Sequence, residues 1–137
     1  MDTRYILDEQ VGFLLRRVTQ RHLSIFSGAI PEMTTTQFAA LAKLTELGPL
    51  SQNHLGRLTA MDGATIKGVV DRLVRQGMVV TSPDPDDRRR LTVSLTEQGR
   101  AAYLAAEPRA VGVTEATLDP LTERERAQLV ALLAKMV

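Results

Sequence analysis

Apolar residues recur at steps of three and four along most of the chain, which is the period of an amphipathic helix. The first such segment predicts a long helix from Tyr5 to Phe26. A second helix is expected to open at residues 34–37 and to stop at Gly48-Pro49, because glycine ends helices and proline cannot continue one. Its apolar stripe comprises Phe38, Leu41, Leu44 and Leu47.

Two shorter helices separated by a tight break are predicted next. Ser51 is a candidate N-cap for the first, which would turn Leu55 and Leu58 inward. Asp62 is a candidate N-cap for the second, which should end at Gln76-Gly77 with a glycine C-cap. The inward face of the helix after Asp62 is expected to comprise Ile66, Val69, Val70, Leu73 and Val74.

After this helix the apolar residues no longer follow a helical period. Two short runs rich in β-branched residues follow, MVVTS at 78–82 and LTVSL at 91–95. These runs predict an antiparallel hairpin whose tip is the segment DPDDRRR. A further helix is expected from Thr96 to about Thr117, in which Pro108 should kink the helix or interrupt its hydrogen-bond ladder. Thr122 and Glu125 form a capping-box pair before a last helix, whose apolar stripe is Leu129, Leu132 and Leu133.

Composition supports one mainly helical domain. A chain of 137 residues fits a single core, and 44% hydrophobic residues with only 4% aromatic ones favour packed helices. The absence of cysteine excludes disulfides, zinc–cysteine sites and thiol redox sensing. No apolar run reaches 18 residues and the N-terminus lacks the order of a secretion signal, so a cytoplasmic protein without membrane contact is expected.

The overall charge says little about partners, because the formal net charge is only +1. Residues 57–100 hold 8 of the 17 basic and 6 of the 16 acidic residues, which is a slight positive excess. Local placement is more informative. Three consecutive arginines, Arg88, Arg89 and Arg90, stand on a turn already marked by two prolines and three aspartates.

Two short helices followed by a two-stranded ribbon have the order of a winged helix-turn-helix. Over essentially its whole length the chain resembles the MarR (multiple antibiotic resistance regulator) transcription factors, in TTTQFAALAKLTELGPLSQNHLGRLTAM, TIKGVVDRLVRQGMV and DDRRRLTVSLTEQG. The last stretch carries Asp87-x-Arg89 followed by Leu95-Thr96-x-x-Gly99, the most diagnostic pattern of that family. The resemblance implies a single domain over 1–137, mainly α with a small antiparallel β-hairpin. Residues 34–96 would form the DNA-binding lobe, and 1–30 and 97–137 the dimerisation helices.

The resemblance implies roles for the hairpin tip, or wing. Arg89 matches the family's minor-groove arginine, and an arginine on a narrow hairpin can sense groove width and negative potential. Asp87 would brace the wing, because a carboxylate that holds an arginine fixes the shape of the tip before DNA arrives. Arg88 and Arg90 would lie on either side, with one or both contacting phosphates. A solvated turn that neutralises itself is the alternative.

The helix after Asp62 would be the recognition helix in the major groove. Its outward positions should be Ala64, Thr65, Lys67 and Gly68, followed a turn later by Asp71 and Arg72. Many family members have a base-reading arginine where this chain has Gly68, which weakens any transfer of base specificity. Candidate phosphate contacts at the preceding helix are Ser51, Gln52, Asn53 and His54, although for Ser51 the role of a simple N-cap is favoured.

Family members are usually homodimers, and the chain ends offer a reason. The first and last predicted helices are amphipathic and lie outside the DNA-reading unit, so a second copy could cover their apolar stripes. Alternatively, they complete the core of the monomer. A twofold dimer would read double-stranded DNA as an inverted-repeat operator.

The resemblance also implies a repressor released by a small aromatic or anionic ligand, in a cleft between the dimerisation helices and the DNA-binding lobe. A cation beside an aromatic wall suits an aromatic carboxylate or a thioester conjugate. Each candidate could instead be a surface charge or an ordinary core residue. The candidates are Arg16, Arg17, His22, Phe26 and Phe38.

Other function classes have less support. The chain has only two histidines, His22 and His54, and no nucleophile elbow, glycine-rich phosphate loop or clustered carboxylates, so no enzyme and no cofactor are predicted. A metal-responsive regulator would need compact ligand spacing, which is not seen, and no metal site is predicted. A winged-helix protein-interaction module remains an alternative, opposed by the intact Asp87-x-Arg89 pattern.

Overall fold

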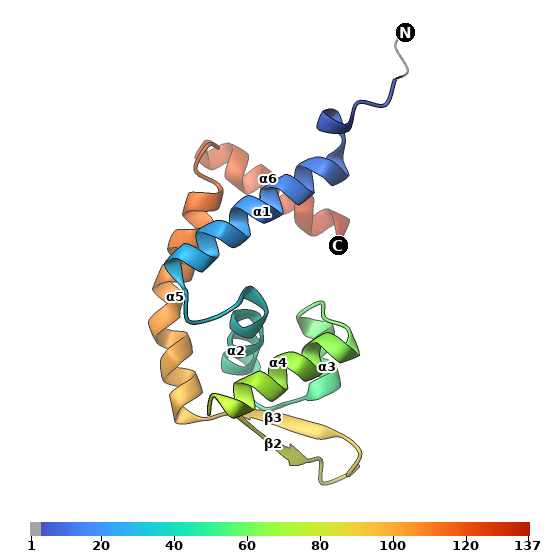
Figure 1. Ribbon diagram of the computed structural model, residues 1–137, viewed down its shortest axis with the longest axis vertical. Coiled ribbons are helices and arrows are strands. Elements are labelled where there is room, and N and C mark those ends of the chain that lie inside the picture. Colours follow the sequence, from blue (N-terminus) through green and yellow to red (C-terminus); the bar gives the residue numbers. More distant parts are fainter. Residues whose placement is uncertain (1–3) are drawn as a thin grey trace. The chain divides into compact units, whose positions relative to one another are not determined.

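The computed structural model describes residues 4–137 and is mainly helical with a small antiparallel sheet, as the sequence predicts (Figure 1). A 3-10 turn, η1, spans Leu7–Glu9. The helices are α1 (Val11–Ala29), α2 (Thr35–Leu47), α3 (Gln52–Leu58), α4 (Gly63–Arg75), α5 (Glu97–Thr117) and α6 (Glu123–Met136). The strands are β1 (Leu50–Ser51), β2 (Val79–Pro83) and β3 (Leu91–Leu95).

The chain divides into two compact units. Residues 30–109 form one, which contains α2, α3, α4, the three strands and most of α5. The described residues before position 30 and after position 109 form the other, with α1, α6 and the end of α5. We call these the winged unit and the helical unit.

Short polar side chains begin the helices at the predicted positions. The Thr34 hydroxyl accepts the Gln37 backbone N–H at 3.2 Å, and the Gln37 side chain returns a bond to the Thr34 N–H. Asp62 accepts the Thr65 N–H at 2.7 Å, and Thr122 forms the expected capping box with Glu125. These caps satisfy amide groups that have no partner inside the helix.

The first helix starts later than predicted. Gln10 has extended backbone angles, and the Gln10 side chain donates to the Ile6 carbonyl at 2.8 Å. The predicted start at Tyr5 is therefore wrong, because α1 begins at Val11. The helix continues beyond Phe26, where the apolar pattern ends, to Ala29. The spacing of apolar residues does not separate a 3-10 turn from a helix, since both place residues three apart on one side.

The sheet contains the predicted hairpin and one further strand. Strands β2 and β3 pair antiparallel with Thr81 opposite Val93. The two-residue strand β1 joins the other side of β3, so that the order is β1-β3-β2. Val79 and Val93 are almost fully buried and anchor the sheet to the core of the winged unit.

The core of the winged unit is aliphatic. A buried aliphatic side chain contributes roughly 1.5–3 kcal/mol to the free energy of folding relative to an exposed one.

Three predicted inward residues are instead exposed: Leu47 at 50%, Leu58 at 36% and Val74 at 40%. The buried arc of each helix is narrower than its apolar stripe, and Val69 and Phe38 are only half-buried. The residues that are fully buried include Leu41, Leu44, Leu55, Ile66, Val70, Leu73, Val79 and Val93.

Helix α5 includes Pro108 and stays helical from Glu97 to Thr117. Proline lacks an N–H, so the helix loses one hydrogen bond at this point. Ala106 and Val113 are buried on either side of Pro108. Their packing holds the helix on both sides of the missing bond.

Polar contacts join α1 to the end of α5 in the helical unit. Much of the apolar surface of this unit is exposed to solvent. Arg21 donates to the carbonyls of Thr117 and Ala116 at 2.6 and 2.7 Å, and therefore caps the C-terminal end of α5. No residue of α6 is buried. None of the helices in residues 4–137 is long and apolar enough to cross a membrane. The exposed apolar residues of α1 and α6 include Val11, Leu14, Leu15, Val18, Leu23, Val130, Leu132, Leu133 and Met136.

Candidate nucleic-acid interface

Helix α4 presents a polar surface that begins at its N-terminus. All five predicted contact residues on this helix are exposed. The Lys67 ammonium forms an ion pair with Asp71 at 2.8 Å, one turn along the same helix. The hydrogen bond from the Thr65 backbone lowers the pKa of Asp62, so this cap carries a negative charge at neutral pH. The five residues are Ala64, Thr65, Lys67, Gly68 and Arg72.

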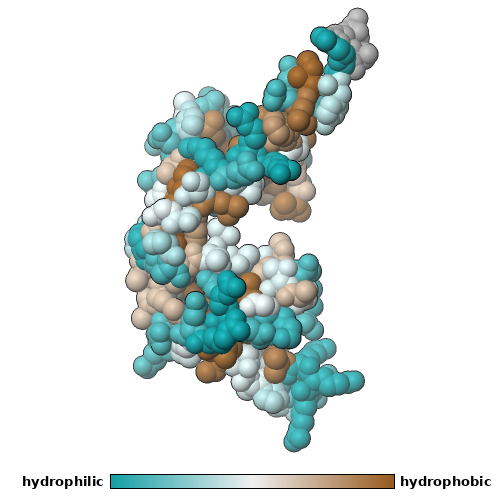
Figure 2. Space-filling view, viewed as in Figure 1, coloured by the Kyte–Doolittle hydropathy of each residue, from teal (hydrophilic) through white to brown (hydrophobic). Residues whose placement is uncertain are grey.

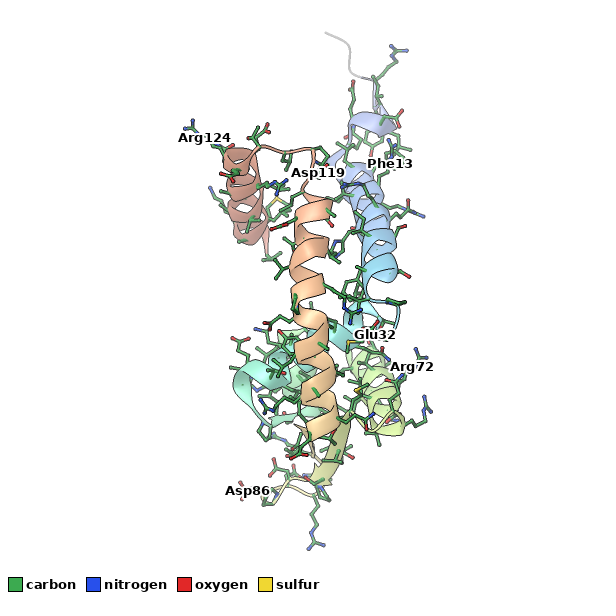
Figure 3. All side chains as sticks on the ribbon, turned by 90° about the vertical axis from the view of Figure 1, so that its left-hand side faces the viewer. Phe13, Glu32, Arg72, Asp86, Asp119 and Arg124 are labelled. Atoms are coloured by element: carbon green, nitrogen blue, oxygen red, sulfur yellow. The ribbon has the colours of Figure 1, made fainter. Side chains whose placement is uncertain are left out.

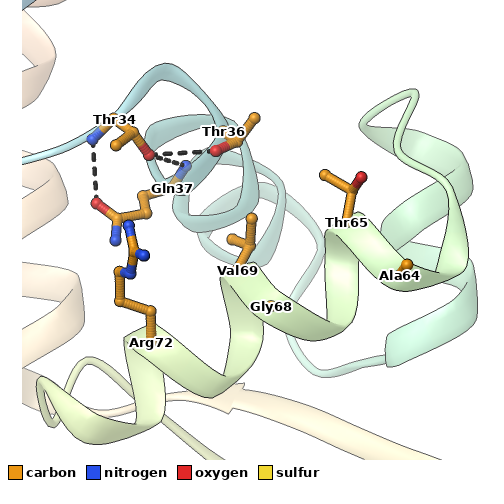
Figure 4. A pocket seen from close by; sticks show the side chains of 8 residues that line it. All are labelled: Thr34, Thr36, Gln37, Ala64, Thr65, Gly68, Val69 and Arg72. Carbon is orange, nitrogen blue, oxygen red and sulfur yellow. Dashed lines mark hydrogen bonds between the residues drawn. The ribbon is translucent and has the colours of Figure 1, made fainter.

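A groove of about 260 Å³ separates this surface from the start of α2. Figure 4 shows Arg72 extending across it toward the Gln37 side chain, with Gly68 at its edge. A Cβ atom at Gly68 would meet no atom within 4 Å. The contribution of α2 to this surface was not predicted from the sequence. The groove is lined by Thr34, Thr36, Gln37, Ala64, Thr65, Gly68, Val69 and Arg72.

Backbone and carboxylate contacts shape the tip of the hairpin. The Asp84 carboxylate accepts the Asp86 N–H at 2.8 Å, and the Asp84 N–H donates to the Arg90 carbonyl at 2.9 Å. The Arg90 N–H donates to the Asp87 carbonyl at 2.9 Å. Aspartates therefore fold the turn that carries the arginines, which explains the mixture of charges in this segment. Figure 3 labels Asp86 at this tip, and Figure 2 shows the hydrophilic side chains gathered there.

Asp87 contacts two of the three arginines. Its Oδ1 accepts the backbone N–H of Arg89 at 3.0 Å and the Nε of the same residue at 3.3 Å. Its Oδ2 lies 3.9 Å from the Nε of Arg90. The Asp87 side chain is 34% exposed, whereas the Arg89 side chain is 93% exposed. Arg88 is also exposed, so the wing presents guanidinium groups to solvent.

The wing and the start of α3 share one surface. A hollow of about 90 Å³ is lined by Ser51, Gln52, Asn53, Arg89, Arg90 and Leu91. The structure thus brings together two sets of residues that the sequence assigned to DNA separately. Within the described chain, the buried Oε1 of Gln52 has no hydrogen-bond partner. The Ser51 hydroxyl accepts the His54 N–H at 3.2 Å, so Ser51 is an N-cap.

Of the five ligand candidates, four lie on α1 in the helical unit. Arg16 and Arg17 are exposed, and the Arg17 guanidinium lies 5.9 Å from the centre of the Phe13 ring. The Nδ1 of His22 lies 2.9 Å from the Thr117 hydroxyl. Phe26 is buried, as the alternative of an ordinary core residue expected.

Phe38, the fifth candidate, belongs to the winged unit. Its ring packs against Tyr103 with centroids 5.3 Å apart.

Arg21, which was not predicted, joins Arg17, Leu14 and Val18 around a shallow hollow of about 340 Å³ on α1. Within residues 4–137 there is no group of three or more histidine, aspartate or glutamate side chains that could hold a metal ion.

Comparisons with known proteins agree with this architecture. A family model described as the MarR family matches residues 32–90. The HTH-type transcriptional repressor NicR of Pseudomonas putida is 44% identical over 138 residues, which cover 99% of this chain and 87% of NicR. A crystal structure of a probable transcriptional regulator from Pseudomonas aeruginosa has a TM-score of 0.93 at 49% identity, covering 96% of this chain and 100% of that one.

A third similar protein has a described ligand. The structure of BpsR from Bordetella bronchiseptica, whose DNA binding is regulated by 6-hydroxynicotinic acid, has a TM-score of 0.93 at 41% identity. The match covers 97% of this chain and 96% of BpsR. The identity to NicR over nearly the full length of this chain is sufficient to assign the family. The chain belongs to the MarR family of transcription regulators.

Proposed function

We propose that the protein is a homodimeric repressor that binds an inverted-repeat operator in double-stranded DNA and is released by a small aromatic acid. The observation that carries this proposal is the surface shared by the wing arginines and the start of α3. Guanidinium groups of Arg89 and Arg90 stand beside the polar side chains of Ser51 and Asn53. This combination suits a phosphate backbone and an adjacent minor groove.

The recognition helix supplies the second part of the DNA surface. Thr65 can contact a thymine methyl group or a phosphate, and Lys67 a guanine edge or a phosphate. Arg72 is suited to the DNA backbone. Asp71 accepts a hydrogen bond from Lys67 in the free protein at 2.8 Å, and the other two N–H groups of the Lys67 ammonium can still contact DNA.

The exposed apolar surface supports a dimer. Leu14, Leu15 and Val18 on α1 are 42–50% exposed, and Leu132 and Met136 on α6 are about 60% exposed. A second copy would remove this surface from water, at roughly 25 cal/mol per Å² of apolar area. Twofold symmetry would place two recognition helices on successive turns of one DNA face, about 10 base pairs apart.

The ligand class is proposed from α1 and from a relative. Arg17 and Arg21 stand beside Leu14 and Val18, so cations adjoin an apolar surface that could receive an aromatic ring. Arg21 already binds carbonyl groups of α5, which leaves Arg17 as the better counter-charge for a carboxylate. BpsR, which is 41% identical, responds to 6-hydroxynicotinic acid. We therefore favour a hydroxylated pyridine carboxylate.

The test is to select bound sequences from a random duplex pool and then to titrate 6-hydroxynicotinic acid into the selected complex. We expect inverted repeats with half-sites about one helical turn apart, and release of DNA by the acid. Nicotinamide, which has a similar ring without a carboxylate, is the control and should not release DNA. Recovery of random or asymmetric sequences would contradict the operator proposal, and insensitivity to the acid would contradict the ligand class.

A further inference from the structure

Residues 76–78, which follow the recognition helix α4, accept hydrogen bonds at each of their carbonyl groups from residues at the start of α5. The Gln76 carbonyl accepts the Gln98 side-chain amide at 3.3 Å. The Gly77 carbonyl accepts the Thr96 hydroxyl at 2.6 Å, and the Met78 carbonyl accepts the Thr96 backbone N–H at 3.1 Å. Three successive carbonyl groups after α4 therefore have partners within residues 96–98.

The Thr96 hydroxyl links both sides of this contact. It donates to Gly77 and also accepts the backbone N–H of Gly99 at 3.0 Å, as an N-cap of α5 does. The same hydroxyl thus ties the end of α4 to the first turn of α5. Serine can make both bonds, whereas valine, which has a similar shape, can make neither.

Glycines make the close approach possible. Gly77 has a φ of +74°, in the left-handed region that favours glycine. A Cβ atom at Gly99 would overlap the carbonyl oxygen of Met78. The first turn of α5 is therefore packed directly against backbone, without a side chain between. We call the contact of residues 76–78 with 96–99 the α4–α5 joint.

We propose that Thr96 is a positioning residue for operator recognition, acting through the α4–α5 joint on the orientation of α4. The inference rests on the proposed function, because it concerns specific DNA binding. Thr96 touches neither the recognition surface nor the wing tip in its bonds to Gly77 and Gly99. Any effect of Thr96 on the recognition surface must therefore be transmitted through the C-terminal end of α4. Thr65 and Lys67 lie near the N-terminal end of the same helix.

A positioning role predicts a particular pattern of binding. Base contacts require the recognition helix at a defined depth and angle, whereas non-specific contacts to phosphates tolerate small rotations. Loosening the joint should weaken binding to the selected operator more than binding to random duplex. A purely structural role would lower thermal stability without changing the ratio of the two affinities.

The experiment measures binding of the full-length dimer to selected operator and to random duplex by fluorescence anisotropy. Thr96→Val should lower the ratio of specific to non-specific affinity about 5- to 10-fold, which is about the discrimination that one base contact provides. Thr96→Ser should restore it to within about 2-fold. Thr45→Val is the matched control, because Thr45 donates a similar bond to Leu41 at 2.8 Å inside α2. It should lower stability and leave the ratio unchanged.

A folded Thr96→Val protein with the wild-type ratio would overturn the inference. If Thr96→Val does not fold, Gln98→Met decides, since Gln98 is exposed and contributes only one side-chain bond to the joint. Its ratio should fall about 2- to 3-fold, and an unchanged ratio would overturn the inference equally. Wild-type protein without any preferred operator would instead refute the proposed function, and the inference with it.

Discussion

Asp87 holds Arg89 at two points, with one carboxylate oxygen accepting both the backbone N–H and the side-chain Nε. The arginine nevertheless remains 93% exposed. A hydrogen bond at Nε restricts the direction of the Arg89 side chain. The two terminal guanidinium nitrogens are farther from the backbone than Nε and remain available for other contacts. The carboxylate thus restricts the arginine side chain in the free protein. If Arg89 contacts DNA as we propose, this restriction lowers the entropy that binding must remove.

Arg89→Ala is expected to weaken operator binding by about 1–3 kcal/mol, since it removes a contact to DNA without disturbing the core. Fluorescence anisotropy measures the affinity, and circular dichroism monitors the fold. Lys43→Ala is a suitable control, because Lys43 is a surface cation on α2 that pairs with Glu46. Equal affinity for Arg89→Ala and wild type would remove the wing from the mechanism.

Features encoded by neighbouring residues could be predicted from the sequence. The caps at Asp62 and Thr122 depend on a hydroxyl or carboxylate and an amide three residues later, so short segments contain all the information. The same holds for the hairpin, whose two β-branched runs flank a turn rich in aspartate and proline. The hairpin also overlaps the stretches that carry the MarR resemblance, whereas Asp62 and Thr122 lie outside them.

Features that depend on distant residues could not be predicted. Strand β1 has only two residues, Leu50 and Ser51, and its partners lie more than 40 positions later. The groove between α2 and α4 requires the packing of two helices, which no single segment encodes. Arg21 was missed because its acceptors, at Ala116 and Thr117, are about 95 positions away. The exposure of Val74 likewise depends on how wide an arc of α4 the core covers.

Gly68→Ala should raise the free energy of unfolding by about 0.5–1 kcal/mol, because glycine inside a helix is less favourable than alanine by that amount. The structure has room for the methyl group, with no atom within 4 Å. If Gly68 lets α4 approach the floor of the major groove, the same change should weaken operator binding. Chemical denaturation and anisotropy give the two values. A variant that is more stable and binds the operator as tightly would assign no DNA role to this glycine.

An ion pair between Glu32 and Arg109 should make stability depend on pH. Arg109 holds Glu32 through two hydrogen bonds, and this contact lowers the pKa of Glu32 from its ordinary value of 4.5. The pair stabilises the fold while Glu32 is ionised, above its unfolded-state pKa. That contribution is lost as the pH falls through the lower pKa of the folded state.

Glu32→Gln should therefore melt below wild type at pH 7, and the difference should close as the pH falls below about 4.5. Both side chains are more than a third exposed, so the difference should be small and should shrink with added salt. Calorimetry across pH 3–7 measures it. Glu115→Gln is the control, since Glu115 is exposed and makes no ion pair in the described chain. A difference that did not shrink between pH 5 and pH 3 would mean that charge is not its cause.

Ligand and operator should oppose each other reciprocally if release is allosteric. A ligand shifts the protein only when it prefers the conformation that binds DNA poorly, and equal affinity for both conformations shifts nothing. An acid that weakens operator binding tenfold, about 1.4 kcal/mol, should therefore bind about tenfold more weakly to the operator complex than to free protein. Isothermal calorimetry with 6-hydroxynicotinic acid can measure both affinities.

Arg17→Ala should reduce this response, because the Arg17 guanidinium stands beside Phe13 and the apolar surface of Leu14 and Val18. Operator affinity without ligand should not change, since Arg17 lies in the helical unit and the proposed DNA contacts lie in the winged unit. Arg16→Ala, on the same helix, tests whether any cation on α1 suffices. If the acid bound free and operator-bound protein equally well, release would have to arise from another cause, and the allosteric explanation would be wrong.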